Sequence, residues 1–325
     1  MKINLKLQGN NLRMLYALII SVVVLALLPL IPNSYTIVLI LYLYFVFLAM
    51  MEMWNLVAGY SGLAFLGPQA IIGLAAYTLA GLSLSAIPIP LGIIAGGAVG
   101  AIMGLVMGVL VQRMKGLYFA IGTLMVPMAL AVFFDDYKPP GAPTNEWGGA
   151  GVTIPGASFY TLNDLYYLAL IVGIASIVIT YLIVNSRVGL VLVAIGDNDV
   201  VASTVGVNAN IYKIYIMMLS GFITGIAGGI YYLFTGYVYP FDAFGVSWLM
   251  LIIVGTVIGG IGTLWGPLIG AAISTLMRQY LASFAGLYLL IEGIIVVFII
   301  LAVPEGIYGY LMKRRRSSGG QSTGK

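Results

Sequence analysis

The sequence contains no cysteine and no histidine, and only 7% of its 325 residues are charged. Without cysteine there can be no disulfide bond and no thiolate metal site, and without histidine the commonest acid–base group and metal ligand is missing. The phosphate-binding pattern G-x-x-x-x-G-K-[ST] is also absent, so ATP binding of the usual kind is not expected. We therefore expect no catalytic site, no metal and no cofactor.

What the sequence has instead is apolar residues, which make up 62% of it and give a mean hydropathy of +1.09. A membrane-spanning helix needs about 20 mostly apolar residues. The composition therefore predicts an all-α polytopic membrane protein with about eight to ten transmembrane helices in a single domain, residues 1–316. We expect the first apolar run to be a retained span and not a cleaved signal. The apolar runs lie at about 14–31, 35–51, 67–86, 91–111, 117–134, 165–184, 214–236, 247–261, 266–285 and 287–303.

The charged residues orient these runs in the membrane. If the spans alternate, one side receives almost all of the basic residues, namely Lys2, Lys6, Arg13, Arg113, Lys115, Arg187, Lys213 and residues 313–316. The positive-inside rule then places both termini and residues 185–213 in the cytoplasm. Residues 135–164, which are rich in Pro and Gly and net acidic, fall on the opposite side. The low-complexity residues 317–325 are expected to form a disordered cytoplasmic tail.

The cytoplasmic segment 185–213 is unusually polar for this chain. At about 29 residues it is longer than the usual helix-to-helix connection of 2–8 residues, so we expect it to have structure of its own. Within it, "VVASTVGV" at residues 200–207 follows Asp197 and Asp199 and favours a short capped helix that ends at Gly206. The apolar side of such a helix would lie on lipid or dock into a groove of another protein, and periodicity does not separate these two.

This segment resembles the cytoplasmic coupling loop of ABC importer permeases, whose motif is E-A-A-x-x-x-G. Ala202 and Gly206 match the motif, while Val200 stands where the acidic residue would be. The resemblance implies that a separate ATPase subunit docks here. The residues that we assign to coupling are Asp197, Asp199, Ala202 and Gly206.

A second resemblance extends over most of the chain. "WNLVAGYSGLAFLGPQAIIGLAAYTLAGL" at residues 54–82 is similar to the signature of branched-chain amino-acid importer permeases, N-L-x-x-G-Y-x-G-x-x-S-L-G-H-x-x-F-x-G-x-G-A-Y. "GLYFAIGTL", "IGGIGTLWGPLIGAAI" and "PEGIYG" follow in the order of that family, and the whole is more similar to LivM than to LivH. Phe65 replaces the usual serine and Pro68 the usual histidine, which leaves urea or short amides open as substrates beside branched-chain amino acids.

The resemblance implies a permease subunit in the cytoplasmic membrane of a prokaryote, and not an enzyme. It would form the pathway for branched-chain amino acids, with ATP hydrolysed by a separate ATP-binding subunit and solute delivered by an extracytoplasmic substrate-binding protein. It would pair with a second, related permease, and no nucleic acid is involved. The alternative is an ion-coupled secondary transporter, which would need a carboxylate in mid-membrane, and only Glu292 suits that role.

Two glycine clusters interrupt the apolar runs. The first ends in the pair Gly67-Pro68 and the second in the pair Gly266-Pro267. Glycine costs about 1 kcal/mol relative to alanine inside a helix, whereas proline is favoured at a helix's first position. The clusters therefore predict helices that start near Pro68 and Pro267 in or close to the membrane, with N-termini suited to a substrate carboxylate. The other interpretation is that these glycines only let helices pack closely. The residues assigned to the substrate pathway are Gly59, Tyr60, Gly62, Gly67, Pro68, Gln69, Tyr118, Gly262, Gly266 and Pro267.

Few other charges lie within the spans, where a charge at the bilayer centre costs about 2.5–3.5 kcal/mol. We expect Arg278 to sit at the outer end of its span and extend to the interface, and Glu52 to lie near a cytoplasmic end. Residues 135–164 would form the outer mouth, contact a substrate-binding protein or serve as a connector. The tyrosines near the predicted outer boundary, such as Tyr231 and Tyr232, are typical of an interfacial aromatic belt.

Overall fold

A computed structural model describes residues 24–31, 34–114, 116–139, 146–197, 208–281, 293–294 and 306–310. The predicted short helix at 200–207, the carboxylate of Glu292 and the tail 317–325 lie outside the described residues. The described helices are α2 Tyr35–Trp54, η3 Asn55–Tyr60, α3 Pro68–Leu84, α4 Ile89–Arg113, α5 Leu117–Asp136, α6 Leu162–Val184, α7 Arg187–Asp197, α9 Ala209–Thr235, α10 Pro240–Ala243, α11 Val246–Gly259 and α12 Gly266–Leu281. Short 3₁₀ turns occur at η2 Leu28–Leu30, η4 Gly148–Ala150 and η5 Ala157–Phe159.

The helices confirm the predicted fold class of a polytopic, all-α membrane protein. Among the described residues, six helical segments are long and apolar enough to cross a membrane: Tyr35–Tyr60, α4, α5, α6, α9 and Pro240–Gly259. Helix α3 is also apolar but has only 17 residues. The predicted spans at 14–31 and 287–303 lie largely outside the described part of the chain.

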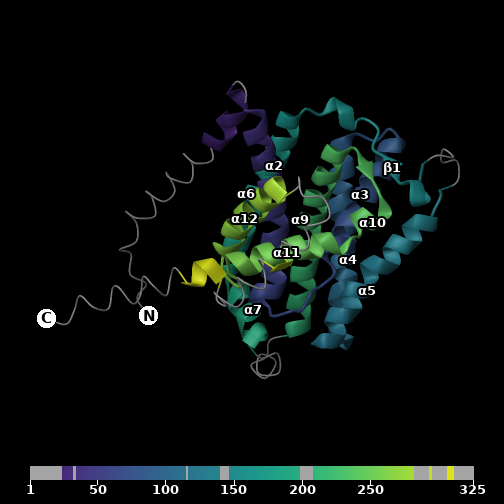
Figure 1. The fold of residues 1–325 in the computed structure, drawn as a ribbon. Helices are drawn as coiled ribbons and strands as arrows, with labels where there is room; N and C mark the ends of the chain where they lie inside the picture. Colours follow the sequence, from purple (N-terminus) through teal and green to yellow (C-terminus); the bar gives the residue numbers. More distant parts are fainter. Residues whose placement is uncertain are drawn as a thin grey trace.

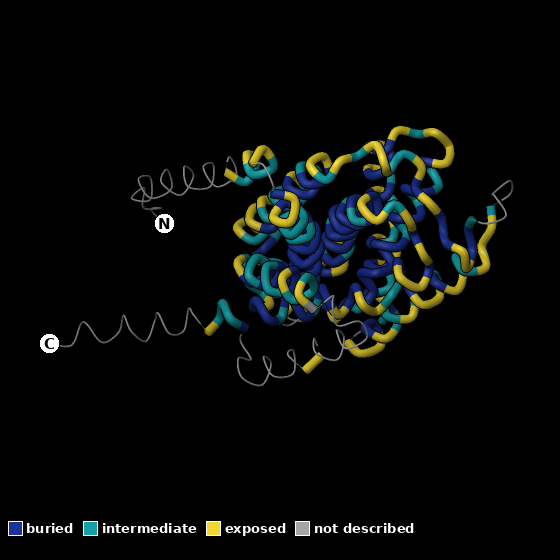
Figure 2. The backbone as a smooth tube through the Cα atoms, turned by 45° about the horizontal axis from the view of Figure 1, so that its top comes forward, coloured by how far each residue is buried: buried dark blue, intermediate teal, exposed yellow. Residues whose placement is uncertain are grey.

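The two ends of the helix bundle differ in structure. At one end, strands β1 (Val152–Thr153) and β2 (Tyr237–Val238) pair antiparallel, with Val152 opposite Val238. At the other end lies α7, at the bottom of the view in Figure 1. We call these the β end and the α7 end. Figure 2 shows that the buried backbone runs through the middle of the bundle and that exposed residues surround it.

Helices α4 and α9 pack against each other through glycine. Gly96, Gly100 and Gly104 recur every four residues on one face of α4, and Gly100 faces Gly221 of α9 so closely that each would clash with a methyl group on the other. Small residues at this spacing let helix backbones approach within the membrane, where van der Waals packing drives helix association. The glycines of α4 therefore act in packing and do not break the helix.

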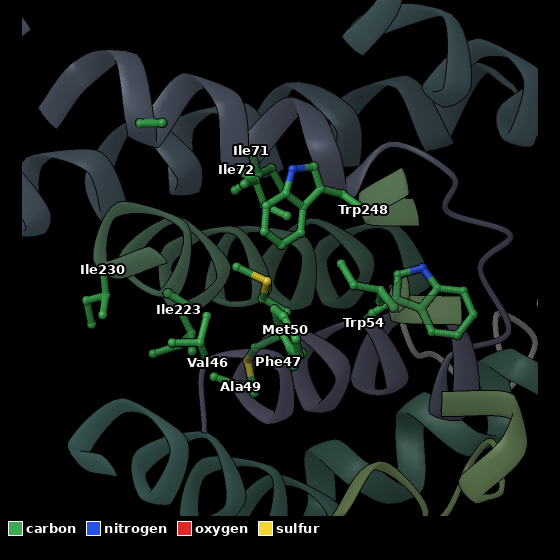
Figure 3. Packing of buried hydrophobic residues seen from close by; sticks show 14 of the residues in the cluster. Val46, Phe47, Ala49, Met50, Trp54, Ile71, Ile72, Ile223, Ile230 and Trp248 are labelled. Atoms are coloured by element: carbon green, nitrogen blue, oxygen red, sulfur yellow. The ribbon is translucent and has the colours of Figure 1, made fainter. Parts of the chain in front are cut away.

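The buried core is centred on α2 and contains large side chains from several helices. Phe47 and Met50 of α2 point toward Trp248 of α11, and Ile71 and Ile72 of α3 lie beside it (Figure 3). The rings of Phe47 and Trp248 meet edge to face, with centroids 6.4 Å apart. Such pairs are favourable beyond the area that they bury, so they fix how α2 and α11 approach each other.

Two helices lie in the polar segment 185–213. Helix α7 occupies its first part, and α9 begins at Ala209, five residues before the apolar run that was expected to start at residue 214. Ala209, Lys213 and Ile216 are all buried on one face of α9. Their spacing of four and three residues follows the helical repeat, and this tertiary burial extends the helix beyond the apolar run.

Candidate functional site

The first glycine cluster forms a break between α2 and α3. Helix α2 changes to π-helical winding at Asn55 and keeps it through Tyr60, after which residues 61–67 are irregular. Helix α3 then begins at Pro68, with Gly67 as its N-cap. The prediction of a helix start at this Gly-Pro pair is confirmed. The π-helix is rare, and its short segments inside α-helices are frequent at functional sites.

The second cluster forms a corresponding break between α11 and α12. Helix α11 ends at Gly259, and α12 starts at Gly266, so the second predicted helix start is confirmed as well. The connection is held by Thr263, whose hydroxyl donates to the carbonyl of Gly260 (2.7 Å) and accepts from the N–H of Gly266 (3.0 Å). Gly262 has a φ of +73°, a conformation that favours glycine.

The two breaks are bound to each other although about 200 residues separate them. The side-chain amide of Asn55 donates to the carbonyl of Thr263 (2.9 Å) and accepts from the N–H of Gly262 (2.8 Å). A methyl group at Gly59 would lie 2.6 Å from the backbone nitrogen of Gly262, so only glycine permits this approach. Asn55 therefore couples the positions of the two breaks through backbone groups that local helix geometry leaves unpaired.

Helix α3 starts inside the bundle and not at its end. The N–H of Leu66 donates to the hydroxyl of Thr123 (3.1 Å), and Gly67 packs against the carbonyl of the same threonine. Thr123 lies six residues beyond the start of α5 at Leu117, which is about 9 Å along a helix. Beside this helix start, Gln69 is fully buried, and its Oε1 accepts no hydrogen bond from the part of the chain that the structure describes.

The polar segment 185–213 reaches the first break directly. Gly196 of α7 packs against it: a methyl group at Gly196 would lie 2.9 Å from the carbonyl oxygen of Tyr60, and one at Gly62 would lie 3.0 Å from the Cα of Gly196. Asp197 follows and is exposed. Thus α7 touches one break, and that break is bound to the other.

Most residues assigned to the pathway from the sequence lie in these two breaks. They are Gly59, Tyr60, Gly62, Gly67, Pro68, Gln69, Gly262, Gly266 and Pro267. Tyr118 differs, since it lies in the first turn of α5 with 77% of its surface exposed. Of the residues assigned to coupling, Asp197 is described at the end of α7, and Asp199, Ala202 and Gly206 lie outside the described residues.

Sequence reasoning did not assign a site role to Asn55, Thr263 or Gly196. Asn55 had a signal, because an amide in an apolar run must find buried partners. Thr263 and Gly196 had none, because their roles depend on segments that are distant in the sequence. Glu52, one turn before Asn55, is fully buried, and neither of its carboxylate oxygens has a hydrogen-bond donor in the described structure.

Comparison with known proteins identifies the family of this chain. The sequence profile of one family, described as branched-chain amino acid transport system / permease component, matches residues 34–304. The chain belongs to this family. It is an ABC transporter permease, a multi-pass membrane protein and a transport subunit rather than an enzyme.

Individual relatives of this permease are distant and differ in their named solutes. It is 22% identical to the high-affinity branched-chain amino acid transport system permease protein LivM of Salmonella typhimurium, over 83% of this chain and 69% of LivM. It is 28% identical to the inner membrane ABC transporter permease protein YjfF of Escherichia coli, over 70% of each chain. It is 30% identical to the nucleoside ABC transporter permease protein NupC of Lactococcus lactis, over 43% of this chain and 47% of NupC. No solved structure matches the chain.

Proposed function

We propose that this permease forms the translocation pathway for branched-chain amino acids in an ABC importer. A separate ATP-binding subunit drives it, an extracytoplasmic substrate-binding protein delivers the solute, and a second, related permease completes the pathway as a heterodimer. The α7 end lies in the cytoplasm and the β end outside. This orientation follows from the basic residues in the predicted cytoplasmic segments and the acidic residues near the β strands.

The observation that carries the proposal is the contact of Gly196 with Tyr60 and Gly62. The ATP-binding subunit docks on the segment that contains α7, and a shift of α7 presses on the first break through backbone atoms. Asn55 passes that shift to the second break by its two hydrogen bonds. Packed interfaces of this kind move between discrete arrangements and do not deform gradually, which suits a two-state transport cycle.

The proposed solute matches the chemistry of the two breaks. The N-termini of α3 and α12 carry partial positive charge, which favours a carboxylate. Leu63 and Phe65 of the first break supply apolar side chains suited to an aliphatic solute, and both are buried. Phe65, at the position of the family's serine, accepts a hydrogen bond on its backbone carbonyl from Trp54 Nε1 (2.8 Å), and its ring is packed inside the protein.

The test is uptake by a purified complex. The permease is co-purified through a C-terminal tag with its partner proteins, reconstituted into liposomes and supplied with the binding protein and internal ATP. We expect ATP-dependent uptake of leucine, isoleucine and valine. Uptake of a nucleoside or urea in preference to these would reject the proposed solute, and uptake by the permease alone without ATP would reject the ABC mechanism.

A further inference from the structure

Arg278 is a charged residue on an apolar helix, α12, three residues before its last residue Leu281. Its guanidinium carbon lies 5.5 Å from the ring centre of Phe47, 5.9 Å from that of Tyr231 and 5.7 Å from that of Trp248. These rings come from α2, α9 and α11, and we call them the aromatic box; Figure 3 shows two of them, Phe47 and Trp248. Arg278 therefore packs against rings from three helices, and its extension to the membrane interface stays a prediction.

The aromatic box is fixed by packing and hydrogen bonds. Phe47 and Trp248 are buried, and the rings of Tyr231 and Trp248 meet edge to face with centroids 4.6 Å apart. The indole N–H of Trp248 donates to the carbonyl of Asp242 (3.1 Å), and the carboxylate of Asp242 accepts from the hydroxyl of Tyr232 (2.8 Å). The protein's own contacts thus hold the box in place, and cation–π attraction holds the guanidinium without neutralising its charge.

Among the described residues, most of the hydrogen-bonding capacity of Arg278 is unused. A guanidinium carries five N–H donors, and the structure records one hydrogen bond from it, to the hydroxyl of Tyr231 (3.2 Å). No Asp or Glu in the described ranges forms an ion pair with it, and the carboxylate of Asp242 accepts a hydrogen bond from the hydroxyl of Tyr232. The side chain is half-buried, so part of the guanidinium remains accessible.

The missing partner has a defined chemistry. A charged group is strongly disfavoured against hydrocarbon, so the accessible side of Arg278 faces an aqueous route or an anion. The planar fork of N–H groups matches a carboxylate, which it binds with two parallel hydrogen bonds. The neighbouring rings add an apolar surface of the kind that an aliphatic side chain prefers.

We propose that Arg278 binds the carboxylate of the transported amino acid in the β half of the permease, before the solute reaches the two breaks. The position fits this order: Tyr231 is four residues from the end of α9 at the β end, and Trp248 is in the first turn of α11. The inference rests on the proposed function, and it adds an entry site that is separate from the helix N-termini at the breaks.

The first test measures whether the solute protects Arg278 from chemical modification. Phenylglyoxal, which reacts with guanidinium groups, is applied to the purified full complex, and the modification of each arginine is followed by mass spectrometry. We expect excess L-leucine to slow the modification of Arg278 several-fold, whereas isoamylamine, which has leucine's side chain but no carboxylate, gives no protection. Arg113, which is exposed in the last turn of α4 at the α7 end, serves as the internal control. It should be modified at the same rate with leucine and with isoamylamine.

The second test separates charge from fork geometry in transport. Arg278→Gln removes the charge and should raise the KM for leucine uptake about 10- to 100-fold, the range for losing a charge-assisted hydrogen-bonded pair. Arg278→Lys keeps the charge without the fork and should fall between this variant and the wild type. The matched control Arg113→Gln should leave KM unchanged.

Three outcomes would overturn the assignment. The first is equal protection by leucine and isoamylamine, and the second is an unchanged KM in Arg278→Gln. The third is normal uptake by a double variant, in which Arg278→Gln is combined either with Glu292→Gln or with removal of a carboxylate from another subunit. Such recovery would mean that Arg278 forms an ion pair with a protein carboxylate and not with the solute. A wild-type complex that takes up no leucine would instead refute the proposed function, so the two failures are distinguishable.

Discussion

At the residue scale, Asn55 has the greatest consequence for this permease. Its two hydrogen bonds join the break after α2 to the break after α11, and both acceptor and donor on the far side are backbone groups. The side chain is fully buried, so water does not replace a lost partner. A single amide therefore sets how two separate hairpins of helices meet.

We expect Asn55→Ala to destabilise the permease by up to about 1–3 kcal/mol for each of the two half-buried backbone groups left unpaired. Thermal unfolding of the purified protein in detergent measures the change. The matched control is Asn185→Ala, because Asn185 also donates from its amide to a backbone carbonyl, of Tyr181 (2.8 Å), but in an exposed position. Equal losses in the two variants would mean that Asn55 does not hold the breaks together.

At the element scale, glycine has two distinct uses in this chain. In α4 and α9 it lets two long helices touch along their length, and in the breaks and α7 it lets irregular backbone approach a helix end. The first use determines stability, whereas the second lies where transport requires movement. Substitutions that add one methyl group can therefore tell the two apart.

For the packing glycines, Gly100→Ala is expected to cost about 1–3 kcal/mol, the usual range for overpacking. Its new methyl group would press on the backbone of Gly221 in α9. Gly229→Ala on α9 is the control, since its methyl group would meet its nearest atom at 3.8 Å, an ordinary contact. The melting temperature should fall for Gly100→Ala and stay the same or rise for Gly229→Ala, and the reverse order would contradict the packing role.

For the coupling contact, Gly196→Ala should uncouple ATP hydrolysis from uptake. Alanine favours helix, so α7 itself is not weakened, but its methyl group would lie 2.9 Å from the carbonyl oxygen of Tyr60. We expect uptake per ATP hydrolysed to fall several-fold while the subunits still co-purify. Gly81→Ala, whose methyl group would meet Trp147 at 3.7 Å, is the control. An unchanged ratio in Gly196→Ala would remove α7 from the coupling route.

At the scale of the whole molecule, the bundle has two unlike ends, and its orientation in the membrane decides what each can bind. The α7 end carries the segment assigned to the ATP-binding subunit, and the β end carries the strand pair, Asp242 and the acidic loop. Because the chain has no cysteine, it is already suited to labelling at single introduced cysteines.

The orientation predicts a clear labelling result. Phe159→Cys at the β end should react with a membrane-impermeant maleimide in intact cells stripped of any outer layer, because Phe159 is 86% exposed. Leu190→Cys on α7 should react only after the membrane is permeabilised. Because Leu190 is also highly exposed, a difference in labelling between the two sites would reflect the side of the membrane and not burial in the protein. Labelling in the opposite pattern would invert the proposed topology.

Local patterns were sufficient for the features that depend on nearby residues. The apolar runs predicted the membrane class and most spans, because hydrocarbon demands about 20 apolar residues in sequence. The pairs Gly67-Pro68 and Gly266-Pro267 predicted two helix starts, since proline's fixed φ and missing N–H suit the first turn of a helix. The family resemblance was likewise carried by short motifs and is confirmed.

The sequence by itself thus determined the membrane class, the family and where α3 and α12 begin. Only the tertiary structure decided that Asn55 reaches Gly262 and Thr263, that Gly196 meets the first break, and that three rings surround Arg278. The physical reason is that each of these contacts joins elements far apart in the chain. Their meeting depends on how glycine-lined helices pack, a property that no local periodicity contains.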